Sequence, residues 1–219
     1  MHVVDHPVQC RYDVAMNATP PPSPRERALL AAAAREFATA GFERASLNAV
    51  IRACGMSKSS FYHRFDSKQA LFDRVVDEAA AALARELAAP DPAELAGPDF
   101  WPRLEAFVAH AAAALAKPAW YADLGKLFYL PDVSAERSAA MRRLLAGVDR
   151  WVQAVLKAGR ACGAVRDDLP ASLQAELAFA VLQAMDRWSI RHMETMGAAA
   201  RRRLAASQLD SLRRLLAPD

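Results

Sequence analysis

Residues 46–65 read Ser-Leu-Asn-Ala-Val-Ile-Arg-Ala-Cys-Gly-Met-Ser-Lys-Ser-Ser-Phe-Tyr-His-Arg-Phe, and they decide the fold of the N-terminal part of the chain. Ser46 and Ser57 each precede a short run with helical spacing of apolar side chains, so each serine is expected to cap a helix. Gly55 lies between the two runs and predicts a tight turn. Two short helices joined in this way form a helix-turn-helix, whose second helix is predicted over residues 57–64.

The side chains of this motif divide into a buried set and an exposed set. The buried set is expected to fill the space between the helices and consists of Val50, Met56, Phe61 and Phe65. The exposed set offers a cation, hydroxyl groups, a phenol and an imidazole, all of which commonly contact DNA. We therefore predict that the second helix enters the major groove, with DNA contacts from Ser57, Lys58, Ser59, Ser60, Tyr62 and His63.

Two lysines occupy positions that favour a bound phosphate. Lys58 and Lys68 both lie in the first turn of a predicted helix, where the helix dipole disfavours a cation by roughly 0.3 kcal/mol or more. A DNA phosphate docked at the same helix end would reverse that cost, because helix N-termini and lysines both attract anions. The alternative is that both are ordinary surface lysines.

Basic residues are concentrated in the same part of the chain. The whole sequence has a formal net charge of +3, and residues 25–75 alone hold nine Lys and Arg against five Asp and Glu, a net charge of +4. Such a local excess is typical of surfaces that bind nucleic acid. Charge alone is equally compatible with an ordinary solvated surface.

The composition favours helix along all 219 residues. Ala and Leu dominate, 53% of residues are hydrophobic and only eight are Gly, and no run alternates apolar and polar residues as a strand would. We predict an all-α fold of about nine helices, at residues 23–40, 46–54, 57–64, 67–89, 99–116, 119–130, 134–162, 170–193 and 198–216.

Three parts of the chain differ in character. Residues 1–22 end in Pro20-Pro21-Pro22 and show no periodicity, so they are predicted to form a flexible arm. Residues 23–75 form the helix-turn-helix DNA-binding domain with three helices. Residues 76–219 form a second, larger helical domain.

Other classes of protein find little support. The three cysteines form no CxxC pair, and the five histidines have no metal-ligand spacing. No GxSxG, HExxH or phosphate-loop motif points to catalysis. No run reaches the roughly 18 apolar residues of a membrane span, and the N-terminus lacks the basic-then-apolar order of a signal peptide. We therefore predict a cytoplasmic protein that is not an enzyme and has no metal, cofactor or membrane partner.

The N-terminal segment resembles the tetracycline-repressor-like (TetR) family of bacterial transcriptional regulators. The resemblance extends from Ala31 to Val76. It rests on Phe37, Gly41-Phe42, Ser46-Leu47, Ala53-Cys54-Gly55-Met56-Ser57-Lys58, Phe61-Tyr62-His63-Arg64-Phe65 and Ser67-Lys68-Gln69-Ala70-Leu71. The chain departs from the usual family residues at three positions, where Ile51 replaces Ala, Ser59 replaces Gly and Ser60 replaces Thr.

The resemblance implies roles for individual residues of the motif. Phosphate contacts would come from Ser46, Tyr62 and Lys68. The candidates for reading bases would be Lys58, Ser59 and His63. Because Ser59 adds a side chain where the family often has Gly, the base contacts of relatives do not transfer directly to this position.

The resemblance also implies that the C-terminal domain binds a small effector and forms a dimer through its last two helices. Residues 170–193 are apolar on two sides, as a helix covered by both its own subunit and a partner would be. The predicted dimer interface consists of Leu173, Leu177, Val181, Leu209, Leu212 and Leu216. The predicted effector pocket consists of Phe107, His110, Trp120, Tyr121, Phe128, Trp151, Met185 and Trp188. Aromatic residues at helical spacing are also common in a plain core, which is the alternative for each of them.

The sequence thus predicts a homodimeric regulator that binds a palindromic double-stranded DNA operator. A small, largely apolar effector would release it from the DNA, as expected for a repressor. The rival hypothesis is a dimer that organises DNA without any effector.

Overall fold

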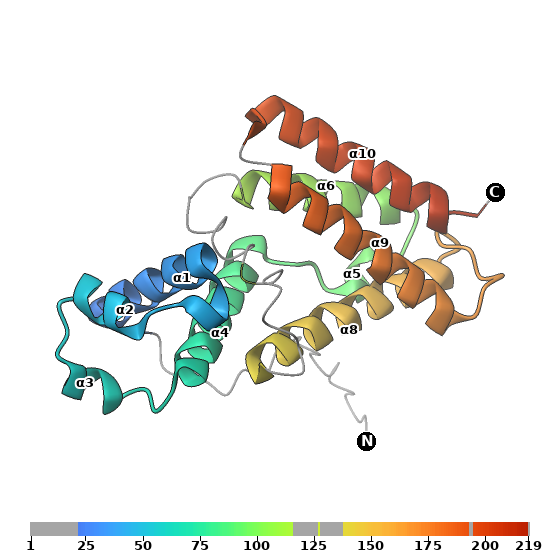
Figure 1. The fold of residues 1–219 in the computed structure, drawn as a ribbon. Coiled ribbons are helices and arrows are strands. Elements are labelled where there is room, and N and C mark those ends of the chain that lie inside the picture. The colour runs from blue at the N-terminus through green and yellow to red at the C-terminus, as the bar shows by residue number, and fades with distance from the viewer. Residues whose placement is uncertain (1–21, 116–126, 128–137, 193–194, 219) are drawn as a thin grey trace, which may run out of the picture.

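We analysed a computed structural model of the chain, which describes residues 22–115, 127, 138–192 and 195–218. Every regular element in these ranges is a helix (Figure 1), which confirms the predicted all-α fold. The helices are α1 (Pro24–Arg44), α2 (Leu47–Ala53), α3 (Lys58–Tyr62), α4 (Lys68–Leu87), α5 (Pro92–Leu95), α6 (Phe100–Leu115), α8 (Ala139–Ala161), α9 (Ala171–His192) and α10 (Ala198–Leu216).

The first three helices and the start of α4 surround one hydrophobic core. Phe37 of α1 meets the ring of Phe72 of α4 edge-on at a centroid distance of 5.1 Å, and both side chains are almost fully buried. Gly41 interrupts α1 with φ +78°, a conformation that glycine tolerates, and one further turn continues to Arg44. The predicted buried residues are confirmed: Val50, Phe61 and Phe65 lie in this core and Met56 packs against it.

Helix α4 belongs to both parts of the molecule. Its first half carries buried residues that pack on α1, and its neighbour on the other side is α8. Ala140 and Met141 at the start of α8, together with Leu127, lie in the same hydrophobic cluster as the helix-turn-helix core. The two parts of the chain are therefore joined by packing as well as by the continuous helix.

A second core holds the C-terminal helices together. Helices α9 and α10 pack beside each other, α10 lies against α6, and α9 lies against α8 (Figure 1). The cluster includes Phe100 and Trp101 of α6, Val155 of α8 and Leu209 of α10. The indole Nε1 of Trp101 donates to the carbonyl oxygen of Ala164 at 2.9 Å, which ties α6 to the loop after α8.

Most helix predictions agree closely with the structure. Helix α10 has the predicted bounds, and α4, α6 and α9 differ from the prediction by one or two residues. Helix α8 is described from Ala139 onward. The predicted arm and the predicted helix at residues 119–130 lie outside the described residues, apart from Pro22 and a buried, helical Leu127.

Helix α5 is absent from the predicted set, because the prolines of residues 90–98 indicated only a loop. Pro92 occupies its first turn, and the Asp91 carboxylate accepts from the backbone N–H of Ala93 at 2.9 Å. A helix of four residues is too short to display the periodicity on which the prediction depended.

Candidate nucleic-acid interface

The helix-turn-helix is built by local hydrogen bonds that follow from its sequence. The hydroxyl of Ser46 accepts from the N–H of Ala49 at 3.3 Å, and that of Ser57 accepts from the N–H of Ser60 at 3.2 Å. Both predicted caps are therefore confirmed. Gly55 has φ +61° in the turn between α2 and α3, where it avoids the strain of a side chain.

The predicted DNA-contacting residues of α3 lie on an exposed surface. Lys58, Ser59, Ser60, Tyr62 and His63 are all exposed, whereas Phe61 between them is fully buried. The Tyr62 side chain is 50% exposed although its ring meets that of Phe61 edge-on at 5.3 Å, so the phenol is held at the surface. This face can offer a cation, hydroxyl groups and an imidazole to a DNA groove.

Two serines of this surface form a hydrogen bond with each other. The hydroxyl of Ser57 donates to the Ser60 hydroxyl at 2.9 Å, while it caps α3. The Ser60 oxygen accepts this bond, so its own O–H can still be donated to a phosphate or a base. Ser57 is therefore a positioning residue for the helix, and Ser60 keeps a donor for DNA.

Lys68 has partners inside the protein. Its Nζ donates to the carbonyl oxygens of Glu43 at 2.7 Å and Ala45 at 3.4 Å, and it lies 5.1 Å from the ring centroid of Phe42. These carbonyls lie at the C-terminal end of α1, where a cation is favoured. The interactions explain a lysine in the first turn of α4 without any phosphate, so the helix-dipole argument does not by itself place a phosphate at Lys68. An ammonium has three N–H donors, so one remains for DNA.

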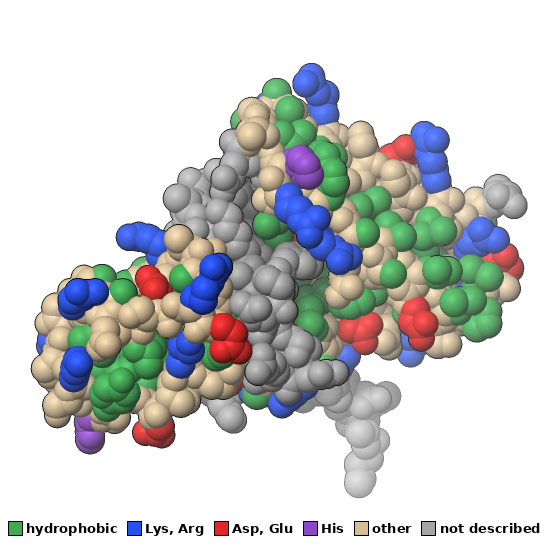
Figure 2. Space-filling model, in the orientation of Figure 1, with side chains coloured by type: hydrophobic (Ala, Val, Ile, Leu, Met, Phe, Trp, Pro, Cys, Tyr) green, Lys and Arg blue, Asp and Glu red, His purple; other side chains and the backbone are tan. Residues whose placement is uncertain are grey.

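Lys58 differs from Lys68 in its surroundings. It is exposed in the first turn of α3, and no hydrogen bond or ion pair joins its ammonium to any other described residue. The argument from the helix dipole therefore still applies to Lys58. Figure 2 shows further Lys and Arg side chains spread over the surface of the domain that contains α1, α2 and α3.

The sequence prediction did not include several residues that position the motif. The Glu36 carboxylate accepts from the N–H of Ser46 at 2.8 Å and so fixes the start of α2. The Glu26 carboxylate pairs with Arg74 of α4 at 3.3 Å and with Arg64 after α3 at 3.8 Å. Ser23 and Glu26 have the spacing of a capping box, and this pattern could have identified Glu26 from the sequence as a residue with a structural role.

A second group of polar contacts joins α4 to the start of α8. The buried hydroxyl of Ser138 donates to the carboxylate of Asp73 at 2.6 Å and accepts from the N–H of Met141 at 3.1 Å. The amide of Gln69 donates to the same carboxylate oxygen at 3.0 Å. One turn further, Arg143 pairs with Asp77 at 2.7 Å. These contacts join the start of α8 to α4, the helix that also packs on α1.

Replacement of Ser138 by alanine tests this junction. We expect Ser138→Ala to lower the free energy of unfolding by about 1–2 kcal/mol, because it removes both a helix cap and a hydrogen bond to a carboxylate. Urea denaturation followed by circular dichroism measures the change. The exposed Ser172 of α9 provides the control, since Ser172→Ala should change stability by less than about 0.5 kcal/mol. Equal effects of the two replacements would contradict the role given to Ser138.

The predicted effector residues are only partly brought together. Phe107 and Trp151 pack at a ring-centroid distance of 5.4 Å, and Phe107 and His110 line a pocket beside the end of α4. Trp188 instead lies on the surface of α9, 45% exposed and stacked on His192. Met185 is half-buried on the same helix. The remaining predicted residues, Trp120, Tyr121 and Phe128, lie outside the described part of the chain.

The predicted dimer residues divide between the surface and the interior. Leu173 and Leu177 of α9 are 42% and 39% exposed, and Val181 is half-buried. The three leucines predicted on α10, Leu209, Leu212 and Leu216, are buried within the chain. Figure 2 shows hydrophobic side chains gathered over α9 on the viewed face. Among the predicted dimer residues, those left exposed therefore lie on α9, while those of α10 are buried within the chain.

Other kinds of site find no support in the described residues. Within these ranges, no three His, Cys, Asp or Glu side chains gather as they would around a metal ion. None of the described helices is long and apolar enough to cross a membrane. Burial raises the pKa of the Cys54 thiol, so this half-buried side chain stays protonated at neutral pH and contributes to packing.

Comparison with known proteins gives a family match over the N-terminal domain. The family described as bacterial regulatory proteins, tetR family, matches residues 29–75. This range contains α2, α3 and the parts of α1 and α4 that support them. No curated protein sequence matches the chain significantly.

Solved structures of regulators share the fold over nearly the whole chain. The TetR-family regulator PfmR from Thermus thermophilus is 22% identical, with a TM-score of 0.63 over 90% of this chain and 98% of that protein. The ketosteroid transcriptional regulator KstR2 of Mycobacterium tuberculosis is 18% identical, with a TM-score of 0.64 over 90% and 96%. FadR from Bacillus subtilis, in complex with stearoyl-CoA, is 14% identical, with a TM-score of 0.65 over 85% and 96%.

Proposed function

Because the chain has the N-terminal domain and the fold of the tetR family of bacterial transcriptional regulators, we propose that it is a sequence-specific, effector-responsive DNA-binding repressor. The observation that carries this proposal is the surface of α3. Polar side chains stand exposed around the fully buried Phe61, which anchors the helix in the core. A rigid helix with an exposed polar face is what major-groove recognition requires.

The proposed active form is a homodimer that binds a palindromic operator. Two copies of α3 would enter successive major grooves about 34 Å apart. The exposed apolar residues of α9 support this assembly, since contiguous apolar surface on a soluble protein commonly marks an interface. In this arrangement Lys58, Ser59 and His63 read bases, while Ser46, Tyr62 and Lys68 contact phosphates.

A small effector would release the repressor by stabilising a state with a different spacing between the two copies of α3. Such a ligand must bind the state that does not bind DNA more tightly than the state that does. Two regulators of the same fold are named for a ketosteroid or were solved with stearoyl-CoA, which supports an effector with a large apolar part. The continuous α4 and its polar contacts with α8 offer a path between the domains.

Fluorescence anisotropy with DNA fragments from the promoter region beside the chain's own gene tests the proposal. We expect saturable binding that weakens steeply as salt increases, because phosphate contacts release counterions. Scrambled fragments of equal length should bind more weakly. Failure to bind any of these fragments at low salt would refute the proposed function.

The two lysines should have different effects on DNA binding. Lys58→Ala is expected to weaken operator binding about tenfold while it weakens binding to random DNA much less, because a base contact is lost. Lys68→Ala should weaken binding to all sequences, reduce the salt slope by about 1 and also lower the melting temperature, since its ammonium bonds the carbonyls of Glu43 and Ala45. Titrations on both DNA types, with Lys157→Ala on α8 as control, measure these effects. Identical behaviour of the two variants would contradict the assignment.

A further inference from the structure

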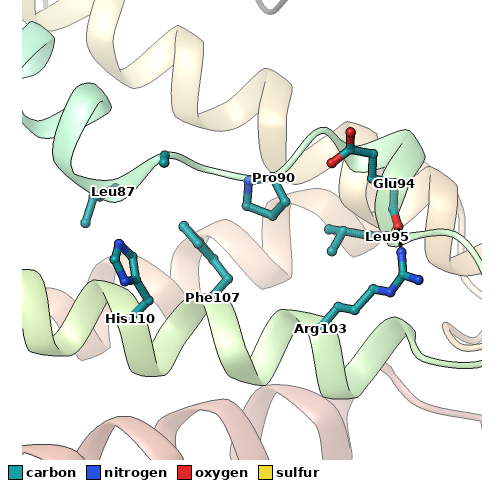
Figure 3. A pocket seen from close by; sticks show the side chains of 8 residues that line it. Leu87, Pro90, Glu94, Leu95, Arg103, Phe107 and His110 are labelled. Carbon is teal, nitrogen blue, oxygen red and sulfur yellow. Dashed lines mark hydrogen bonds between the residues drawn. The ribbon is translucent and has the colours of Figure 1, made fainter.

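The end of α4 forms one wall of a pocket of about 280 Å³ that faces α6 (Figure 3). The apolar lining consists of Leu87, Ala88, Pro90, Leu95 and Phe107. The polar lining consists of Glu94, Arg103 and His110. An apolar pocket with a few polar groups is the usual form of a small-molecule site, and this volume lies just below the roughly 300 Å³ at which sites for drug-sized ligands begin.

The wall opposite α6 is held in place by contacts outside the pocket. The indole Nε1 of Trp151 donates to the carbonyl oxygen of Pro90 at 3.1 Å, and the Trp151 ring packs on Phe107. Ala88, which ends α4, has φ +44°, a left-handed conformation that costs a residue other than glycine about 1–2 kcal/mol. A strained residue fixed by its neighbours is a frequent feature of binding sites.

Three side chains of α6 project into this pocket from one face of the helix. Arg103, Phe107 and His110 are spaced by four and three residues, so they lie in one row. Figure 3 shows all three directed toward the segment from Leu87 to Leu95, with Arg103 at one end and His110 at the other. Seven residues of α-helix rise about 10 Å, which is the separation of the two Cα atoms along the helix axis.

The two ends of the row offer different chemistry. The Arg103 guanidinium donates to the backbone carbonyl of Glu94, and no carboxylate among the described residues forms an ion pair with it. A guanidinium has five N–H donors, so it can still bind a carboxylate in a two-point contact. At the other end, Nε2 of His110 lies 3.2 Å from the carbonyl oxygen of Glu86. That carbonyl only accepts, so Nε2 carries the hydrogen and Nδ1 of the neutral ring is an acceptor.

We infer that this pocket binds a slender aromatic carboxylate with a hydroxyl group at the end opposite the acid. The carboxylate binds Arg103, the aromatic ring packs between Phe107 and Leu87, and the hydroxyl donates to His110. This ligand would be the effector of the proposed repressor, and in that respect its assignment rests on the proposed function. A ligand placed there contacts the last turn of the helix whose first turn supports α3.

Titration calorimetry of the full chain with 4-hydroxycinnamate tests the inference. We expect saturable binding that weakens about tenfold in Arg103→Gln and less in Arg103→Lys, which keeps the charge but loses the two-point contact. Arg35→Gln on the exposed face of α1 should leave binding unchanged. The methyl ester of the probe should bind about tenfold more weakly than the acid, and cinnamate without its hydroxyl should also bind more weakly.

The inference is overturned by no binding at about 5 mM probe, or by equal binding of the probe to the wild type and to Arg103→Gln. Equal binding of acid and ester would overturn it as well. The DNA titrations described above separate this result from the proposed function. If the chain binds the probe but no promoter fragment, the inferred pocket is supported and the proposed function is refuted. If it binds promoter fragments but not the probe, only the inferred pocket is refuted.

Discussion

Gly159→Ala is expected to lower the free energy of unfolding by about 3 kcal/mol, because the added methyl group has no space. A Cβ at this position would lie 2.4 Å from Cγ2 of Val165 and 2.8 Å from Cζ of Phe100. Both neighbours are almost fully buried, so neither can turn away into solvent. The backbone is also fixed there, since the carbonyl oxygen of Gly159 accepts from the N–H groups of Ala164 and Val165.

The same helix contains a matched control. Gly147 of α8 has nothing within 4 Å of the position that a Cβ would occupy. Gly147→Ala should therefore raise stability by about 0.5–1 kcal/mol, since alanine favours helix over glycine. Thermal and urea denaturation of both variants measure the difference, whose sign should be opposite at the two sites. A stable Gly159→Ala variant would show that the packing of α6 on α8 is looser than described.

The helix-turn-helix could be predicted from the sequence because its signals are local. Ser46, Gly55 and Ser57 act on residues no more than four positions away, so the caps and the turn are readable from the order of residues alone. The buried Phe61 is equally clear, since its neighbours are polar and it repeats at four residues with Phe65. The exposed face of α3 follows once the buried face is known.

Interactions between distant residues could not be predicted in this way. Lys68 contacts carbonyls 23 and 25 residues earlier in the chain, and a local argument about the helix dipole could not foresee these contacts. Ser138 and Asp73 are 65 residues apart, and neither residue stands out in the sequence. The leucines of α10 show the same limit, because an amphipathic pattern predicts that a face is buried and does not specify what covers it.

The open face of α9 leads to the prediction with the largest effect on function. Leu177→Glu is expected to convert the proposed dimer to a monomer, because it places a charge in the middle of the exposed row that contains Leu173 and Trp188. Linked reading helices bind an operator with an effective concentration near the millimolar range, so their separation should reduce operator affinity by about 10²–10⁴-fold. Affinity for a single half-site should stay unchanged, since α3 is far from the substitution along the chain.

Analytical ultracentrifugation measures the oligomeric state, and fluorescence anisotropy with full and half operators measures the affinities. Val148→Glu is the matched control, because Val148 of α8 is 42% exposed and lies outside the α9 row. It should leave both the dimer and the operator affinity intact. If Leu177→Glu remained a dimer with wild-type affinity while it kept the wild-type melting temperature, α9 would not be the interface. Because the predicted α10 leucines are already buried within one chain, a different apolar surface would then have to bring the two copies of α3 onto one operator.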